Sequence, residues 1–232
     1  MPIEKGSFIL LDYTARIKET NEVFETTIEE EAKKAGLYNP SIIYEPKLII
    51  IGDGWILKSV EEKLIGLEEN SEITIEIPPE NAFGPRDPNK IKVIPLRRFR
   101  SSEVTPTIGA KVSIDGKEGV IRSISSGRVQ VDFNPPLAGK SLIYECKIRK
   151  IITDPIEKIK YLLHDRIKEV EVNKFFIELL GKEVIIKIPK EAFLLPTLQI
   201  AKKLVSRIIY NHMSEIEKVS FIEEYLKSEI ET

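Results

Sequence analysis

The strongest constraint on this fold is a run of very short apolar segments between residues 112 and 133, separated by glycine turns. Within the run, apolar and polar residues alternate, and Asp115-Gly116 and Ser126-Gly127 separate the segments. Alternation punctuated by glycine at this spacing predicts short β-strands. The basic stretch Lys90–Arg100 precedes the run, and Asn134-Pro135-Pro136 closes it. The sequence therefore predicts a small all-β module in the middle of the chain.

The residues on either side of this module predict a mixed α+β unit. A short charged helix is expected over 29–35, ending at Gly36, and apolar residues at helical spacing predict a second helix over 55–64. Segments rich in β-branched and aromatic residues predict strands around them. These predicted strands are Phe8–Ile17, Val23–Thr27, Lys47–Ile51, Glu72–Ile77 and Ser141–Ile151.

A further unit begins at Asp154-Pro155. Asp154 can cap a helix that has Pro155 at its first position, and an apolar stripe then runs from Ile156 to Val170. Phe175–Leu180 and Val184–Ile188 flank Gly181-Lys182 and predict a β-hairpin. A second helix is expected after Pro196. Ser214 with Glu217 predicts a third, carrying Val219, Ile222 and Leu226. The C-terminal module, residues 154–232, is thus expected to be α/β.

The composition argues against several kinds of site. The chain has 35 basic and 37 acidic residues, so no global field attracts nucleic acid. Its single cysteine, Cys146, cannot form an internal disulfide, and with two histidines the chain has too few ligands for an ordinary zinc site. We therefore expect no metal and no cofactor. Neither a signal peptide nor a run of roughly 20 apolar residues is found, and we expect a cytoplasmic protein without membrane contact.

The familiar catalytic motifs are missing. The sequence contains no GxSxG elbow, P-loop or HExxH, and no GxGxxG that opens a helix after a strand. The candidate site residues are instead aromatic and aliphatic. Gly52–Leu67 joins a glycine turn to an apolar helix that carries Ile56, Leu57 and Val60.

These residues stand in the order of a known family. Tyr13 lies in the first predicted strand, Phe24-Glu25 in the second, and Tyr144 in the last, while Pro79–Gly84 matches a loop that usually reads Ala-Tyr-Gly. With the 52–67 segment, this ordered set over about 150 residues resembles the FKBP family of peptidyl-prolyl cis–trans isomerases. Leu137-Ala138-Gly139 resembles the return from the insert-in-flap domain of its SlyD-like, archaeal long-type members.

The resemblance implies three domains within an α+β fold. An FKBP antiparallel half-barrel wrapped on a short helix would comprise residues 1–96 and 135–153. A small all-β insert-in-flap domain would cover 97–134, and a C-terminal α/β domain 154–232. The resemblance assigns the isomerase pocket to Tyr13, Phe24, Glu25, Ile56, Leu57, Val60, Phe83 and Tyr144. It assigns further substrate contacts to Trp55, Leu137, Ala138, Val112, Ile114, Val129 and Val131.

Prolyl isomerisation suits a chain without catalytic motifs, because no bond is made or broken. The prolyl bond must cross a barrier of about 20 kcal/mol, and an apolar pocket lowers it by binding the twisted form best. We expect an isomerase that accelerates proline-limited folding. Its partners would be unfolded or proline-containing polypeptides, held in chaperone fashion by the insert.

Three positions depart from the family pattern. Phe83 lacks the hydroxyl of the usual tyrosine, a hydrogen bond worth about 1 kcal/mol. Glu25 replaces aspartate, and its longer side chain is expected to displace the contact with Tyr13. Val60 stands where tryptophan or leucine is common. We expect a retained pocket with lowered intrinsic activity or lowered affinity for macrolide ligands.

Other readings remain open at this stage. The pocket residues could simply form the core of a small barrel. The chain could be a holdase chaperone with little isomerase activity. The basic residues Lys90, Lys92, Arg97, Arg98 and Arg100 could hold RNA, but only Phe99 is available for stacking, so no nucleic-acid partner is expected. An apolar face of the C-terminal helices could support a homodimer.

Overall fold

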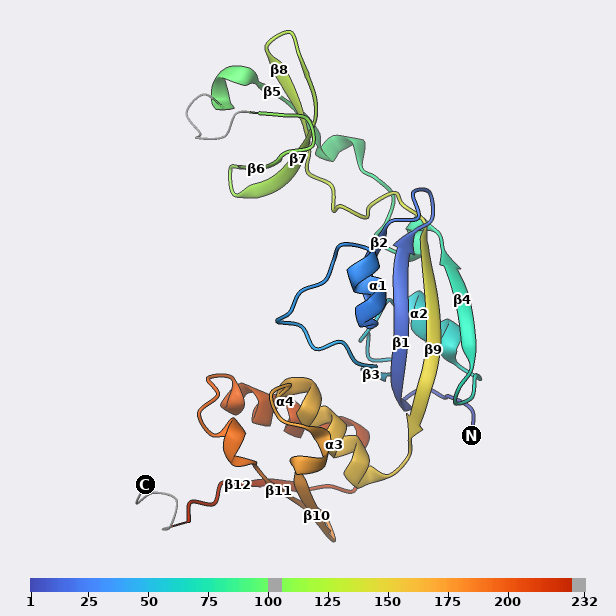
Figure 1. Cartoon of the computed structure of the whole chain (residues 1–232), viewed down its shortest axis with the longest axis vertical. Coiled ribbons are helices and arrows are strands. Elements are labelled where there is room, and N and C mark those ends of the chain that lie inside the picture. Colours follow the sequence, from blue (N-terminus) through green and yellow to red (C-terminus); the bar gives the residue numbers. More distant parts are fainter. Residues whose placement is uncertain (100–105, 227–232) are drawn as a thin grey trace. The chain divides into compact units, whose positions relative to one another are not determined.

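A computed structural model of the chain describes residues 1–99 and 106–226, which divide into two compact units (Figure 1). The first unit comprises Met1–Arg16, Glu22–Ile75 and the chain from Ile143 onward. The second comprises Ile17–Asn21 and Glu76–Leu142. The chain therefore leaves the first unit within β4 and returns to it in β9, so the second unit is made mainly of one internal segment.

An antiparallel sheet organises the first unit. Its strand order is β2-β1-β9-β4, and β3 also pairs with β1. β1 is buried along nearly its whole length, as expected for the strand that contacts three others. The strands are β1 (Phe8–Ile17), β2 (Val23–Thr26), β3 (Lys47–Ile50), β4 (Glu72–Ile77) and β9 (Leu142–Ile152), which confirms the predicted strands to within two residues.

Two short helices accompany this sheet. α1 covers Glu29–Lys34, and α2 covers Lys58–Leu64 with Val60 and Leu64 fully buried. α2 begins three residues later than the sequence predicts, because residues 52–57 form a turn instead. Both predicted helices are present, and the α+β class is confirmed.

The C-terminal module contains α3 (Pro155–Arg166), α4 (Leu198–His212) and a three-stranded sheet. The Asp154 carboxylate accepts the Glu157 N–H at 2.7 Å, which confirms the predicted cap. The hairpin is also confirmed, as β10 (Phe176–Leu180) pairs antiparallel with β11 (Glu183–Lys187).

The predicted third helix is wrong. Residues Lys218–Ile222 form β12, which pairs in parallel with β11 and places Val219 beside Val184 and Phe221 beside Ile186. The Ser214 and Glu217 signal concerns only local capping, whereas β11 offers an unpaired edge and a buried apolar face. Pairing with that edge outweighs a weak helical preference in a short β-branched and aromatic segment.

The C-terminal module shares one apolar core with the first sheet. Phe8 and Ile50 pack in the same cluster as Ile159 of α3 and Val205 and Ile209 of α4. This means that the apolar stripes of both helices cover β1 and β3 as well as their own small sheet.

Polar contacts join the same surfaces of the first unit. Glu45 accepts hydrogen bonds from Lys168 and lies 3.0 Å from His164 Nε2. The ring of His212 packs edge-on against Phe8, while its Nε2 lies 2.7 Å from an oxygen of Asp53. These contacts hold the C-terminal module in place against the rest of the first unit.

The second unit contains a four-stranded antiparallel sheet in the order β5-β8-β7-β6. Its strands are β5 (Ile91–Pro95), β6 (Lys111–Ile114), β7 (Lys117–Ser125) and β8 (Arg128–Asp132). Both hairpin turns, Asp115-Gly116 and Ser126-Gly127, have two successive positive φ angles, the conformation that matches strand twist. The predicted all-β module is confirmed, and its sheet begins at Ile91 within the basic stretch. Short 3₁₀ turns occur at Pro79–Asn81, Pro88–Lys90, Leu96–Phe99, Val172–Lys174 and Lys190–Ala192.

One buried carboxylate anchors the base of this sheet. Asp132 accepts hydrogen bonds from the backbone and side-chain amides of Asn134 at 3.0 and 2.7 Å, and it pairs with Arg86 and Arg122. Burial alone would raise the pKa of Asp132, but the Asn134 bonds and the Arg86 guanidinium outweigh it and lower the pKa to about 2. A folded pKa below the unfolded value of about 3.9 means stability that is present above that value and lost as the pH falls towards 2.

We predict that Asp132→Asn lowers the stability of the second unit by about 2 kcal/mol at pH 7, and that this difference shrinks as the pH falls from 4 to 2. Urea unfolding followed through NMR resonances of β7 and β8 measures both effects. Asp115→Asn is the control, because the Asp115–Arg98 pair is exposed and should contribute less than about 1 kcal/mol. A difference between wild type and Asp132→Asn that stays constant with pH would contradict this account.

Candidate functional site

Three aromatic side chains from neighbouring strands meet in the first unit. Tyr13 of β1 lies 5.8 Å from Tyr144 of β9, and Phe24 of β2 meets Tyr144 edge-on at 6.2 Å, measured between ring centres. Tyr13 and Tyr144 are almost fully buried, whereas Phe24 is half-buried. We call Tyr13, Phe24 and Tyr144 the aromatic cluster. The strand order β2-β1-β9 brings them together, as the sequence predicted for pocket residues.

The Tyr13 hydroxyl donates a hydrogen bond to the Glu25 carboxylate. The displacement expected from the longer glutamate side chain is therefore not found. Lys47 Nζ lies 3.4 Å from the same hydroxyl and 3.8 Å from Glu25. Burial, reinforced by the neighbouring Glu25 carboxylate, raises the pKa of Tyr13 well above its ordinary value. The hydroxyl thus stays neutral and keeps its proton, so the aromatic cluster remains uncharged.

A buried glutamate that the sequence reading missed organises the adjacent turn. Glu61 of α2 is 2% exposed, and its carboxylate accepts the N–H groups of Gly52 at 2.7 Å, Trp55 at 2.8 Å and Ile56 at 3.3 Å. A carboxylate that accepts several backbone N–H groups holds a turn firmly. The available signal was an acid near the start of a helix that follows a glycine turn. We call this segment the 52–56 turn.

The 52–56 turn determines which backbone N–H group remains available beside the aliphatic side chains of Ile56 and Leu57. The N–H of Ile56 is directed to Glu61. No hydrogen bond among the described residues engages the N–H of Leu57. The side chains of Ile56 and Leu57 are half-buried, and Val60 is fully buried one turn along α2. The site elements of the first unit are therefore an apolar surface and the open Leu57 N–H at the start of α2.

Seven predicted site residues belong to the second unit, and three of them, Phe83, Leu137 and Ala138, lie outside its four-stranded sheet. Phe83 is 43% exposed, Leu137 is half-buried, and Ala138 is buried. Gly139 donates its N–H to the carbonyl of Gly84 at 2.8 Å and thereby ties the 79–84 loop to the 135–139 turn. These residues form one local cluster within the second unit.

The predicted client-binding residues have different exposures. Trp55 packs under the Arg166 guanidinium, 5.2 Å from the ring centre, and against the core shared with the C-terminal module. Val129 and Val131 are fully buried in the core of the four-stranded sheet, which leaves neither side chain any surface for a client. Val112 and Ile114 are only half-buried. Contact with a client through the insert can thus involve Val112 and Ile114, whereas Val129 and Val131 support them from within.

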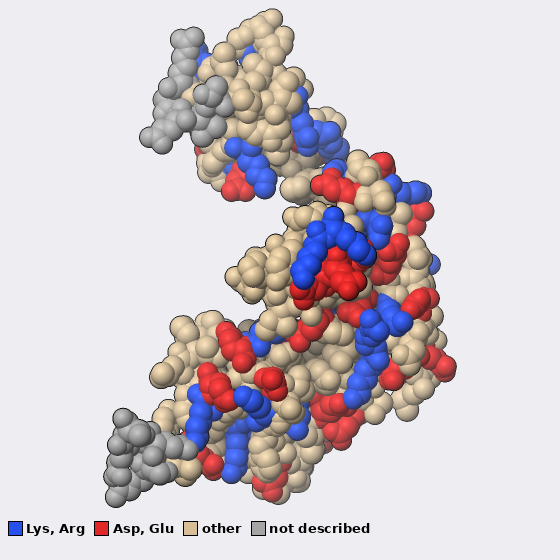
Figure 2. Space-filling model, viewed as in Figure 1, with Lys and Arg blue, Asp and Glu red and all other residues tan. Residues whose placement is uncertain are grey.

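Charges on the first unit are interleaved rather than grouped by sign, as Figure 2 shows over α1 and the sheet. Arg16 pairs with Glu145 and Lys147 with Glu72, each at 2.6 Å.

Across residues 1–99 and 106–226 there is no cluster of three or more His, Cys, Asp or Glu side chains suited to a metal ion. Cys146 is buried, and burial raises the pKa of its thiol to about 12. No helix in the described ranges is sufficiently long and apolar to cross a bilayer.

Comparison with family models finds three matches along the chain. The model described as "FKBP-type peptidyl-prolyl cis-trans isomerase" matches residues 1–98. The model described as "FKBP26, IF domain" matches residues 92–137, and the one described as "FKBP26_C-terminal" matches residues 155–226.

Individual relatives point the same way. A short-type peptidyl-prolyl cis-trans isomerase of Methanocaldococcus jannaschii is 36% identical over 149 residues, which are 64% of this chain and 94% of the relative. The FKBP-type 16 kDa peptidyl-prolyl cis-trans isomerase of Escherichia coli K12 is 29% identical over 64% of this chain and 93% of its own length. SlyD of Aeromonas hydrophila is 24% identical over 69% of this chain and 70% of its own length.

We predict that Glu61→Gln loosens the 52–56 turn, because the amide places a donor where backbone N–H groups need an acceptor. The free energy of unfolding should fall by about 2 kcal/mol, and the amides of Gly52, Trp55 and Ile56 should exchange with solvent faster than in wild type. Amide hydrogen exchange followed by NMR measures this directly.

The matched control is Glu62→Gln on the same helix. Glu62 is exposed and lies 3.7 Å from Lys58, so its substitution should leave these three amides unchanged. Equal exchange rates in Glu61→Gln and wild type would show that the carboxylate does not hold the turn.

Proposed function

Since this chain belongs to the FKBP-type peptidyl-prolyl cis–trans isomerase family, we propose that it accelerates proline-limited protein folding and that its inserted module holds unfolded clients for the isomerase pocket. The observation that carries the proposal is the uncharged aromatic cluster, and the Leu57 N–H of the same unit, which no described residue engages, supports it. An uncharged apolar surface with one backbone donor suits a reaction that needs desolvation and no proton transfer.

In the proposed mechanism, the proline ring of the client packs on Phe24, the half-buried member of the aromatic cluster, while the buried side chains of Tyr13, Tyr144 and Val60 support that surface from within. The Leu57 N–H donates to a client carbonyl oxygen, which fixes the chain while the imide bond rotates. As the bond twists, amide resonance is lost, and the twisted form is better accommodated among apolar side chains than in water. Glu25 orients the Tyr13 hydroxyl by accepting its hydrogen bond. Ile56 and Trp55 are proposed to add client contacts on the first unit, and Phe83 is proposed to contact the client from the second unit.

The proposed domains are an isomerase domain of residues 1–96 and 135–153, an insert of 97–134, and a C-terminal domain of 154–232. The family matches support this order. The pairing of β5 with β8 favours an insert that starts close to Ile91. We propose that the insert raises the local concentration of prolyl bonds near the pocket, as tethering of two sites does.

A second copy of the chain is the proposed partner of the C-terminal domain. β10 is an edge strand, and its Phe176 and Leu180 are 55% and 51% exposed. Such an edge can pair with the same edge of another copy. Sedimentation of wild type against Phe176→Lys checks this proposal, with a dimer expected only for wild type.

A cytoplasmic location and weak macrolide binding stay predictions.

The holdase alternative rests on Phe83, which has no hydroxyl to donate to a client. A refolding assay of a protein whose folding is limited by proline isomerisation, at enzyme concentrations far below that of the substrate, distinguishes an isomerase from a holdase. We predict acceleration by wild type, roughly a tenfold lower kcat/KM for Phe24→Ala, and a moderate gain for Phe83→Tyr. The control is Tyr210→Ala, which removes an exposed aromatic side chain of α4. No acceleration by wild type, with aggregation still suppressed, would favour the holdase.

We also predict that replacing residues 91–132 by a short Gly-Ser linker lowers kcat/KM on an unfolded protein by roughly tenfold or more, while activity on a proline tetrapeptide changes little. The tetrapeptide activity shows that the shortened chain is still folded. Equal losses on the two substrates would contradict the division of labour between pocket and insert.

A further inference from the structure

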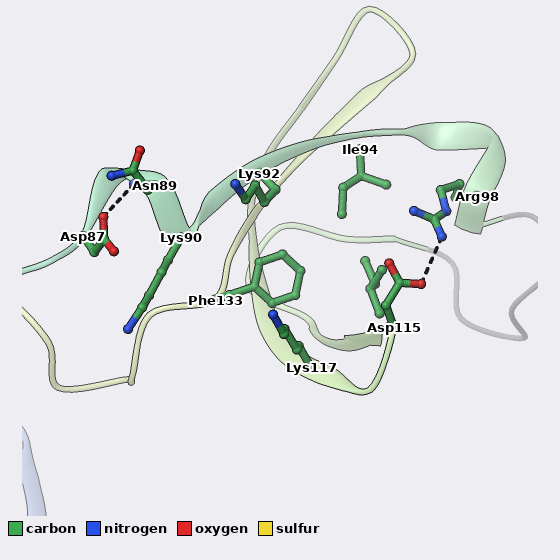
Figure 3. Close-up of a pocket in the computed structure, with 10 residues that line it drawn as sticks. Asp87, Asn89, Lys90, Lys92, Ile94, Arg98, Asp115, Lys117 and Phe133 are labelled. Carbon is green, nitrogen blue, oxygen red and sulfur yellow. Dashed lines mark hydrogen bonds and ion pairs between the residues drawn. The ribbon is translucent and has the colours of Figure 1, made fainter.

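The second unit contains a cleft of about 650 Å³ on its small sheet, which we call the insert cleft (Figure 3). One wall is β5, where Lys92 and Ile94 occur at alternate positions and so lie on the same side of the strand, together with the 3₁₀ turn before it, which contributes Lys90. The opposite wall is the β6–β7 turn, with Asp115 and Lys117. Figure 3 shows the Phe133 ring between these walls.

The insert cleft carries an excess of positive charge. Within the described ranges, none of the Lys90, Lys92 and Lys117 ammonium groups has an ion-pair partner. The two carboxylates of the lining are already engaged. Asp115 pairs with Arg98 at 3.1 Å, and Asp87 accepts the N–H of Asn89 at 2.8 Å but keeps its charge. Three lysines and Arg98 against these two carboxylates leave the lining a net charge of +2, which attracts an anionic ligand.

The floor of the same cleft is apolar. Ile94 is buried, Ile114 and Phe133 are half-buried, and all three pack on the core of the small sheet formed by Ile121, Val129 and Val131. This floor offers contact area for an apolar or aromatic side chain, which lysines alone would not. The combination favours a ligand with an apolar anchor and negative charges beside it.

The walls also present open strand edges. Among the described strands, β5 pairs only with β8, and β6 pairs only with β7. An extended polypeptide can therefore align with an edge and exchange backbone hydrogen bonds with it. Lys92 and Pro95 stand on β5, and such residues discourage indiscriminate pairing of an edge. A cationic edge disfavours basic segments and favours acidic ones.

We propose that the insert cleft selects extended client segments in which an apolar or aromatic residue is flanked by aspartate or glutamate. This inference rests on the proposed function and names the class of client that the insert captures. Single-stranded nucleic acid fits less well, because its binding relies on several stacking aromatics, and Phe133 is the only aromatic residue that lines the cleft.

The test is fluorescence anisotropy of the full chain with labelled decapeptides that contain no proline. One peptide has Leu-Phe flanked by glutamates, a second has Leu-Phe flanked by lysines, and a third has the glutamates without the apolar pair. Wild type should bind the first at least roughly tenfold tighter than the other two, since two or three exposed ion pairs each contribute a few-fold. The affinity should fall with added salt.

Lys90→Glu with Lys117→Glu should reverse the preference between the first two peptides. The control pair is Lys111→Glu with Arg128→Glu, two exposed changes in the same sheet that do not line the cleft, and it should retain the wild-type preference. Lys90→Gln with Lys117→Gln provides a milder pair if the reversal unfolds the sheet, and the salt dependence of wild type needs no variant.

The proposal would be overturned if the three peptides bound with equal affinity or if none of them bound. It would also be overturned if the preference were unchanged in both lining variants, the Lys90 and Lys117 double changes to glutamate and to glutamine. An RNA oligomer that binds more tightly than the acidic apolar peptide and loses affinity in the lining variants would overturn it as well. Tetrapeptide isomerisation is measured on the same preparations. Loss of peptide preference with full isomerase activity defeats this inference alone, whereas absence of isomerase activity with the preference intact defeats the proposed function.

Discussion

The candidate site depends on one buried interaction, the Glu61 carboxylate beneath the 52–56 turn. By accepting the N–H groups of Gly52, Trp55 and Ile56, it fixes the path of the chain into α2. That path leaves the Leu57 N–H open at the start of α2 and sets Val60 inside the core. Rotation about an imide bond makes and breaks no bond, so it needs a dry surface and a well-placed donor. The carboxylate is therefore structural, and its effect on the reaction is one of positioning.

The C-terminal module holds the outer side of the same turn. Asp53 contacts His212 of α4, and Trp55 lies under Arg166 of α3. The apolar core beneath these contacts is continuous from β1 and β3 into both helices. The turn is thus held from inside by Glu61 and from outside by the module, so the C-terminal residues contribute to the rigidity of the pocket side of the fold. Changes in the module are expected to reach the site through Asp53 and Trp55.

Local signals in the sequence were sufficient for much of this fold. The paired residues Asp115-Gly116 and Ser126-Gly127 identify hairpins because few other residues adopt positive φ, and Asp154 identifies a helix start because its side chain satisfies a backbone N–H. In both cases a short stretch of residues contains the physical cause. The aromatic cluster is expected only through the family resemblance, because Tyr13 and Tyr144 belong to strands that lie far apart in the chain.

The features that escaped prediction have their causes far away in the chain. β12 is a strand because β11 offers it an edge, which the capping residues Ser214 and Glu217 do not reveal. Glu61 is the exception, because its partners lie within nine residues of it and an acid near the start of a helix after a glycine turn is a local signal. The resemblance places Trp55 among the substrate contacts, and its contact with Arg166 requires a domain more than a hundred residues later. Long-range pairing of this kind leaves no local pattern.

The most direct test of the central claim is two-dimensional exchange NMR of the full chain with a proline tetrapeptide in large excess. The account predicts exchange cross-peaks between the cis and trans peptide signals, together with a marked shift of the Leu57 amide resonance. The Ile56 amide, already bonded to Glu61, should shift little. Absence of exchange cross-peaks, or exchange with an unperturbed Leu57 amide, would contradict the account.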